Sequence, residues 1–434
     1  MDSRLRGNDV TFEGAGKGDC PMNRNAFYGM PRSRVAARTP TTVRRVRLMG
    51  LLLVGLLLLA YAGIISAART RPAAAESPTT PASAVQQFVD NHTLAGAVML
   101  VASPNRVLSL EAVGYMDIAR KQPMRTDSLF WIASQSKPMT ATALMMLVDE
   151  GKVNVDDPVE KYLPEFKGQW LKAEQDVYHV LLKRPAHPIT VKNVLSHTSG
   201  LPFSSPLEQP TLDLLPLAAR VRSYAMLPLE FEPDSKYSYS NAGINTAGRI
   251  IEVVSGMPYA QFMEQRLFQP LGMKDTTFWP NAKQVARLAK SYQANAAKTG
   301  LEETTITQLQ YPLTDRTREP MPAGGLFSTA SDVARFCQMI LNGGTLDGKR
   351  YLSEAAVRQM TSKQTAEDLT EKYGFGWSVG DGEFGHGGAY ATNMTIDTRH
   401  GLVFVWMVQH AGFPGDGAKS RDAFMAAAKG AFAK

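Results

Sequence analysis

The sequence predicts an α+β fold, in which an antiparallel sheet is built from both ends of the folded chain and is flanked by helices. Apolar segments at 96–102 and 107–113 flank a short Ser-Pro-Asn-Arg turn, which is typical of a β-hairpin. A second strand pair is expected at 390–397 and 402–409, joined by Thr-Arg-His-Gly. The middle of the chain is helical, so strands from the two ends are expected to meet in one sheet, with a helical region beside it.

Apolar periodicity and glycine stops predict the helices. Residues 136–150, 242–255 and 331–341 carry helical apolar patterns, and these patterns stop at Gly151, Gly256 and Gly343-Gly344, since glycine is common just past a helix C-terminus. Shorter patterns predict helices at 84–91 and 421–432.

Two long segments of the middle region show neither helical nor strand periodicity. They cover residues 167–188 and 203–220. We expect both to be irregular and to line a pocket.

The 434 residues divide into a targeting region and one folded domain. Residues 1–47 are basic, 48–68 are apolar, and 69–82 are rich in Pro, Ala, Ser and Thr, a composition typical of an extended linker. Residues 83–434 contain no comparable linker and no repeat, which predicts a single domain.

Six arginines between Arg32 and Arg47 precede the apolar run 48–68, and this order predicts transfer of the following chain across a membrane. Ser66-Ala67-Ala68 fits the cleavage site of a signal peptide. A membrane anchor is the alternative, because the run approaches the roughly 20 residues of a spanning helix. Both readings predict an extracytoplasmic domain, either periplasmic or secreted.

The position of this apolar run also predicts a later start of translation. A signal peptide normally begins near the chain start, so we expect the native start at Met30, or less favourably at Met22. Cys20 would then be absent, and Cys337 would be the single thiol of the chain.

The net charge of +7 arises in the N-terminal region. Residues 1–71 hold 12 of the 47 Lys and Arg but 4 of the 40 Asp and Glu, which leaves 35 bases against 36 acids. Nucleic-acid binding requires a basic surface on the folded domain, so no nucleic-acid partner is expected. The seven His are scattered, and no P-loop, H-E-x-x-H or G-x-S-x-G motif occurs, so neither a cofactor nor a metal is predicted.

Three short motifs contain candidate catalytic residues. Ser134-Gln-Ser-Lys137 begins an apolar helix, and its serine and lysine lie one turn apart on the same face. Serine becomes a nucleophile when a neighbouring base takes its proton. A lysine serves as that base once burial or nearby cations lower its pKa from about 10.4. Taken alone, the motif also fits an N-cap serine followed by a solvent-facing lysine.

The second motif is Tyr239-Ser-Asn241, expected in a loop just before the helix at 242. A tyrosine hydroxyl can relay a proton, and an asparagine can orient a lysine and a substrate carbonyl. Asn241 as a helix cap, with Tyr239 in packing, is the alternative.

The third motif is His386-Gly-Gly388, followed by Ala389, where glycines let a substrate approach a strand edge. A plain glycine-rich loop is the alternative, since a second H-x-G pattern occurs at His410-Ala-Gly412.

Together and in this order, the motifs resemble those of the serine β-lactamase and penicillin-binding protein superfamily. The most similar branch is the class C β-lactamase-like branch, which includes the family VIII carboxylesterases. The resemblance covers about 83–434 and is reinforced by the segments 195–202, 322–329 and 373–377. It implies a β-lactamase/transpeptidase-like fold. We expect His197, within the first of these segments, to be a hydrogen-bonded core residue without a catalytic role.

The resemblance also implies roles for the motif residues. Ser134 would be the acylated nucleophile, Lys137 its activator, Tyr239 the general acid and base, and Asn241 a substrate-orienting group. The backbone N–H groups of Ser134 and Ala389 would form the oxyanion hole, beside the substrate-binding residues His386 and Gly388.

One departure from the family pattern bears on the substrate. Typical β-lactamases carry Lys-Thr-Gly where this chain has His386-Gly387-Gly388. A histidine with an ordinary pKa near 6.5 is mostly neutral at pH 7, so the grip on a substrate carboxylate is weakened. We therefore expect an extracytoplasmic serine hydrolase that cleaves small ester or amide substrates through an acyl-enzyme. A β-lactamase or D-amino-acid peptidase, and a non-catalytic penicillin-binding-like module, are the alternatives.

Overall fold

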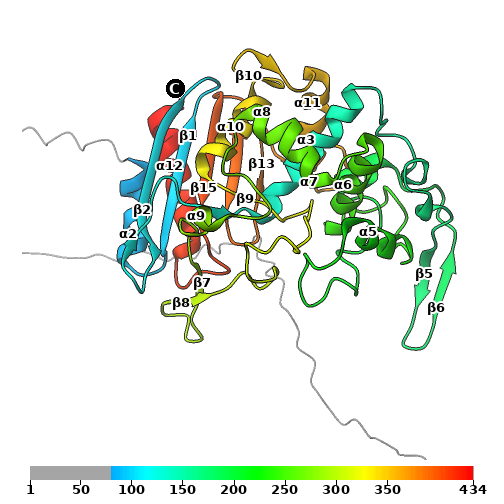
Figure 1. Ribbon diagram of the computed structural model, residues 1–434, viewed down its shortest axis with the longest axis horizontal. Coiled ribbons are helices and arrows are strands. Elements are labelled where there is room, and N and C mark those ends of the chain that lie inside the picture. Colours follow the sequence, from blue (N-terminus) through cyan, green and yellow to red (C-terminus); the bar gives the residue numbers. More distant parts are fainter. Residues whose placement is uncertain (1–79, 434) are drawn as a thin grey trace, which may run out of the picture. The chain divides into compact units, whose positions relative to one another are not determined.

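The computed structural model describes residues 80–433, and its central feature is a seven-stranded antiparallel sheet (Figure 1). The sheet contains β12 (Ser378–Val379), β13 (Glu383–Gly387), β14 (Asn393–Asp397), β15 (Leu402–Met407), β1 (Gly96–Ala102), β2 (Val107–Asp117) and β3 (Gln122–Pro123), in that order. The predicted sheet from both chain ends is thus confirmed. The predicted segments 1–47 and 48–68 and most of the linker at 69–82 lie outside the described residues.

The two central strands, β1 and β15, show how one sheet separates two cores. Val98 pairs with Met407 and Leu100 with Val405, and both strands are buried along their whole length. Because successive side chains of a strand point to opposite faces, alternate residues enter different apolar clusters. One cluster includes residues of α2 (Pro81–Asp90) and α12 (Ser420–Phe432), and the other includes residues of the remaining large helices.

The helices lie on both faces of the sheet (Figure 1). Predicted and observed bounds of four helices agree within two residues, whereas α2 begins at Pro81 because the Thr80 side chain accepts the Ser83 N–H. The remaining α-helices of residues 80–433 are α3 (Ser136–Asp149), α4 (Val191–Ser196), α5 (Leu217–Ala225), α6 (Asn241–Ser255), α7 (Tyr259–Phe262), α8 (Gln269–Leu271), α9 (Ala282–Val285), α10 (Ala330–Leu341) and α11 (Glu354–Thr361).

Two expectations about strands were wrong. Residues 167–188 are not irregular, because β5 and β6 form a hairpin there; β6 is exposed on both faces and therefore has no alternating pattern. The predicted strand at 390–397 starts only at Asn393, since the Gly388 N–H donates to the Thr392 carbonyl in a turn.

Within residues 80–433, four short strand pairs lie outside the main sheet, namely β4 (Phe130–Trp131) with β9 (Phe327–Ser328), β5 (Leu171–Gln175) with β6 (Val180–Lys183), β7 (Ser291–Ala294) with β8 (Leu301–Thr304), and β10 (Thr345–Leu346) with β11 (Lys349–Arg350).

The β4–β9 pair joins two segments that contribute to the candidate site. Trp131 pairs with Phe327, and the Ile132 N–H donates to the Leu326 carbonyl at 2.9 Å. This pairing places the start of α3, which follows β4, beside residues 322–326.

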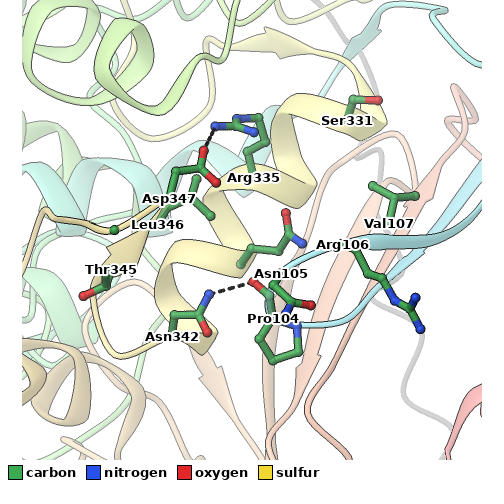
Figure 2. A pocket seen from close by; sticks show the side chains of 12 residues that line it. Pro104, Asn105, Arg106, Val107, Ser331, Arg335, Asn342, Thr345, Leu346 and Asp347 are labelled. Atoms are coloured by element: carbon green, nitrogen blue, oxygen red, sulfur yellow. Dashed lines mark hydrogen bonds and ion pairs between the residues drawn. The ribbon is translucent and has the colours of Figure 1, made fainter.

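A cavity of about 710 Å³ lies between the β1–β2 turn and α10, and Figure 2 shows two of its polar side chains, Arg335 and Asn342, bonded to neighbouring groups. Arg335 is paired with Asp347, and the Asn342 amide donates to the Pro104 carbonyl. None of the motif residues lines this cavity. Within residues 80–433, no helix has the length and apolar character needed to cross a membrane.

Candidate active site

Ser134 lies in a short 3-10 turn, Ala133–Gln135, that runs directly into α3. Ala133 has a φ of +46°, a left-handed conformation that costs a non-glycine residue about 1–2 kcal/mol. The Ser136 hydroxyl holds this turn, because it donates to the Ala133 carbonyl at 2.7 Å and accepts the Leu326 N–H. The nucleophile candidate is therefore fixed by the helix that follows it and by the adjoining segment 322–326.

The Lys137 amine is fully buried and contacts three oxygens. They are the Ser134 hydroxyl at 3.0 Å, the Asn241 Oδ1 at 2.8 Å and the Ala323 carbonyl at 2.8 Å. The amide and carbonyl oxygens can only accept, so a neutral amine donates its two N–H groups to them. Its remaining lone pair then faces the serine hydroxyl, which is the geometry of a general base.

Burial sets the protonation of Lys137. Desolvation lowers the pKa of its amine well below the ordinary 10.5, and no carboxylate is among its hydrogen-bond partners. The imidazoles of His197 and His386 lie close enough to the Lys137 amine for a positive charge on it to lower their pKa values. Burial and that charge lower the pKa of His386 to about 3 and also lower the pKa of His197 well below its usual value.

Tyr239 lies beside this pair. The Lys137 Nζ is 4.6 Å from the centroid of the Tyr239 ring, and the phenol lies close enough to the Ser134 hydroxyl for that hydroxyl to affect the pKa of the phenol. Burial raises the pKa of the phenol, and the hydrogen bond with Ser134 opposes this rise only in part. Tyr239 is therefore protonated at neutral pH and is arranged to donate a proton, while the free lone pair belongs to Lys137.

Asn241 is the first residue of α6, not a residue of the preceding loop as predicted. Ser240 is the N-cap, and its hydroxyl accepts the Gly243 N–H. Capping by Ser240 leaves the Asn241 side chain free to bind Lys137, which removes the capping alternative for Asn241.

His386 lies on β13 and has both ring nitrogens in internal hydrogen bonds. Its Nδ1 is 2.7 Å from the Gly387 carbonyl, so this nitrogen carries the proton. Its Nε2 then accepts the Tyr373 hydroxyl at 3.0 Å. In this arrangement the ring is neutral and has no free nitrogen for a substrate, whereas the prediction assigned His386 to substrate binding.

Gly387, Gly388 and Ala389 follow His386 at the edge of β13 that β12 leaves open. β12 pairs with β13 only as far as Gly385, so residues 386 and 387 are unpaired on that side. A Cβ on Gly388 would lie 2.2 Å from Thr392 Oγ1 and 2.5 Å from the Ile132 carbonyl, so only glycine fits there. Ala389 is exposed, and among residues 80–433 its N–H has no acceptor. This free N–H fits the predicted oxyanion hole.

Four residues outside the three motifs also contribute to the site. The Ala323 carbonyl and the Tyr373 hydroxyl lie in segments that the resemblance quoted, but their contacts depend on tertiary packing. His197 is a buried, hydrogen-bonded histidine as predicted, yet its ring lies 4.5 Å from the Tyr239 ring. Phe203 is 52% exposed and stacks near Tyr239, with the ring centroids 6.4 Å apart.

Comparison with known proteins identifies the family. The Beta-lactamase family model matches residues 82–429. The chain belongs to the Beta-lactamase family. Protein Rv1367c of Mycobacterium tuberculosis is 31% identical over 76% of this chain and 89% of its own length. Esterase EstB of Burkholderia gladioli is 28% identical over 75% of this chain and 88% of its own.

A solved structure shows the same fold. EstCE1, described as a hydrolase with promiscuous acyltransferase activity, superposes with a TM-score of 0.68 at 25% identity, covering 80% of this chain and 97% of its own. The family comprises serine hydrolases with the β-lactamase fold, among them esterases, penicillin-binding proteins and acyltransferases. Within the described part of the chain, no three His, Cys, Asp or Glu side chains are grouped to hold a metal.

The buried lysine predicts a particular pH dependence. Because burial lowers the pKa of Lys137, its amine loses its proton at a lower pH than an exposed lysine does, and activity falls on acidification as the amine takes a proton. Lys137→Met, which keeps the stem and removes the amine, lowers kcat by roughly 10²–10⁴. Steady-state kinetics from pH 4 to 9 on folded protein checks both expectations. A variant that retains activity within tenfold of wild type contradicts the role of Lys137.

The two glycines beside His386 provide a matched pair of substitutions. Gly388→Ala forces a Cβ into Thr392 and the Ile132 carbonyl, so we expect a stability loss of about 1–3 kcal/mol and loss of turnover. At Gly387 the nearest atoms lie 3.6 and 3.7 Å from an added Cβ, so Gly387→Ala retains the wild-type melting temperature. Thermal unfolding of both variants is the measurement, and equal effects would refute this account of the edge.

Proposed function

We propose that this protein is a serine hydrolase that cleaves neutral carboxylic esters through an acyl-enzyme on Ser134. The observation that carries the proposal is the buried Lys137 amine, which has two oxygen acceptors for its protons and the Ser134 hydroxyl opposite its lone pair.

Acylation follows from this geometry. Lys137 takes the proton of Ser134 as the serine Oγ attacks the ester carbonyl, and the N–H groups of Ser134 and Ala389 bind the oxyanion. Collapse of the tetrahedral intermediate breaks the bond to the alkoxide. Tyr239, which is protonated, donates to that alkoxide and regains a proton from Lys137, so an alcohol leaves and the site is neutral again.

Deacylation uses the same groups in reverse. A water molecule gives a proton to Lys137, through the Tyr239 hydroxyl or directly, and its oxygen attacks the acyl carbonyl. The Ser134 oxygen leaves and takes the proton back, which releases a carboxylic acid and restores the enzyme.

The preference for neutral substrates rests on position 386. His386 is neutral, and both of its nitrogens are engaged, so it offers no cation to a substrate carboxylate. Gly387 lacks the hydroxyl that the Lys-Thr-Gly pattern supplies. The half-exposed Phe203 beside Tyr239 adds an apolar surface that suits an uncharged acyl or alcohol group.

The proposed location is extracytoplasmic, and it rests on the arginine-flanked apolar run at 48–68. The alternatives within the family are β-lactamase and D-amino-acid peptidase activity, which use the same nucleophile and lysine. A non-catalytic penicillin-binding-like module is the alternative outside catalysis. Relatedness to EstB and EstCE1 supports the ester-cleaving choice.

A fluorophosphonate probe separates an enzyme from a binding module. We expect one adduct per chain, located on Ser134 by peptide mass spectrometry, because this serine alone faces the neutral Lys137. Ser134→Ala abolishes labelling, whereas Ser136→Ala is not a suitable control since that hydroxyl holds the Ala133 turn. Ser362→Ala, an exposed hydroxyl in a loop, retains it. A folded wild-type protein that stays unlabelled would contradict the enzyme proposal and support the non-catalytic binding module.

The substrate preference is tested with p-nitrophenyl butyrate and a chromogenic cephalosporin. Wild type is expected to have the higher kcat/KM for the ester. The double variant His386→Lys with Gly387→Thr installs a cation and a hydroxyl at the open edge, so the ester-to-cephalosporin ratio of kcat/KM falls by roughly tenfold or more. Faster cephalosporin turnover by wild type reverses the ranking, and an unchanged ratio in the folded variant contradicts our account of position 386.

A further inference from the structure

The Ala323 carbonyl that accepts from Lys137 is itself held from two helices. On α3, one turn after Lys137, the Thr140 hydroxyl donates to the Pro322 carbonyl at 2.8 Å. On α6, one turn after Asn241, the Asn245 Oδ1 accepts the Ala323 N–H at 3.0 Å. Each helix therefore supplies one residue to the site and a second residue that fixes the segment between them.

A buried hydrogen-bond chain continues from Asn245. Its Nδ2 donates to the Tyr224 hydroxyl at 3.0 Å, and that hydroxyl donates to the Glu208 Oε1 at 2.8 Å. The Arg220 guanidinium lies 3.5 Å from the same carboxylate oxygen. Asn245, Tyr224 and Arg220 are fully buried and Glu208 is 2% exposed, so the chain is shielded from water.

The hydrogen bonds between Lys137 and Glu208 all run in the same donor-to-acceptor direction. From the Lys137 amine through Ala323, Asn245 and Tyr224, each group donates toward the Glu208 side. The Asn245 amide and the Tyr224 hydroxyl each accept one bond and donate the next, and bonds aligned in this way strengthen one another in a low-dielectric interior; at Ala323 the accepting carbonyl and the donating N–H belong to successive peptide groups. Glu208 also anchors the segment 203–216, since its second oxygen accepts the Ser205 N–H.

We propose that Asn245, Tyr224 and Glu208 are positioning residues, which hold the Ala323 carbonyl in place for Lys137 and connect this lysine to a buried carboxylate. The inference rests on the proposed function, because it assigns these residues to the proton transfer between Ser134 and Lys137. None of the three reaches the reacting atoms. They act through the acceptor that directs the lysine lone pair.

Few titratable groups lie near Lys137 and Glu208, the two ends of this hydrogen-bond chain. Lys137 is faced by Tyr239 from the loop before α6, His197 from the end of α4 and His386 from β13. Glu208 is faced by Tyr224 and by Arg220 from α5, and Arg220 in turn lies near Glu319. The nearest carboxylate connected to Lys137 by hydrogen bonds is thus that of Glu208.

The first test is Tyr224→Phe, which removes the hydroxyl between Asn245 and Glu208. We expect kcat for p-nitrophenyl butyrate to fall about tenfold with KM unchanged, a part of the roughly 10²–10⁴ that a positioned base contributes. The protonated lysine loses its link to a carboxylate, so the acid limb of kcat/KM moves to lower pH. Ser223→Ala is the matched control, because it deletes a neighbouring buried hydroxyl that bonds only within α5.

The second test is Asn245→Asp, which should move the acid limb of the kcat/KM pH profile in the opposite direction. An aspartate still accepts the Ala323 N–H and brings a negative charge closer to Lys137, so the protonated amine is favoured and the acid limb moves to higher pH by roughly 0.5 unit. Opposite shifts in the two variants, with none in Ser223→Ala, support the proposal. If the acid limb of kcat/KM stays in place in both variants and only their melting temperatures fall, the proposal is overturned and these residues have a structural role.

Labelling of Ser134 distinguishes this proposal from the proposed function. If wild type is neither labelled nor active on esters, the proposed function fails. If wild type is labelled and active while the limbs of both variants stay in place, only the positioning role is refuted.

Discussion

A lysine amine enclosed without a counter-charge is the constraint on which the site depends. Burial penalises the ammonium form, and the two oxygens that accept from Lys137 provide dipoles and no full negative charge. A neutral amine satisfies both acceptors and keeps one lone pair, whose remaining neighbour is the hydroxyl of Ser134. The reactivity of the serine therefore comes from the shortage of charge around the lysine. A carboxylate in direct contact would stabilise the ammonium and remove the base.

Much of the fold serves to maintain this enclosure. The β4–β9 pair holds the turn before α3 against the segment that contains Ala323, and the strained Ala133 is kept in place by the Ser136 hydroxyl. The large sheet lies beside this enclosure at β13, and Gly388, directly after this strand, allows the backbone to approach Ile132 closely. The Lys137 amine contacts Ser134 before α3, Asn241 on α6 and the Ala323 carbonyl, so the site exists only when these distant segments are folded together.

Position 386 shows how one substitution changes the electrostatics of such a site without changing its chemistry. A lysine there would add a second cation near Lys137 and attract carboxylates. His386 is instead neutral, because burial and the neighbouring amine both disfavour its charged form, and Tyr373 occupies its accepting nitrogen. The acylating groups are thereby separated from the group that selects substrate charge. This separation is consistent with a family that contains both esterases and penicillin-binding proteins.

The strands at both chain ends, the helices α2, α3, α6, α10 and α12 and the three motifs could be predicted from the amino-acid sequence, because they depend on local periodicity and short spacing; α4, α5, α7, α8, α9 and α11 were not predicted. Ser134 and Lys137 are three residues apart, and this spacing brings their side chains together across the 3-10 turn and the first turn of α3, so their proximity needed no contact between distant segments. Tertiary structure decided what surrounds them. The Ala323 and Asn241 acceptors of Lys137 lie 186 and 104 residues further along the chain, and no local pattern encodes such contacts. The β5–β6 hairpin was not predicted for a related reason, since β6 is exposed on both faces and carries no alternation to detect.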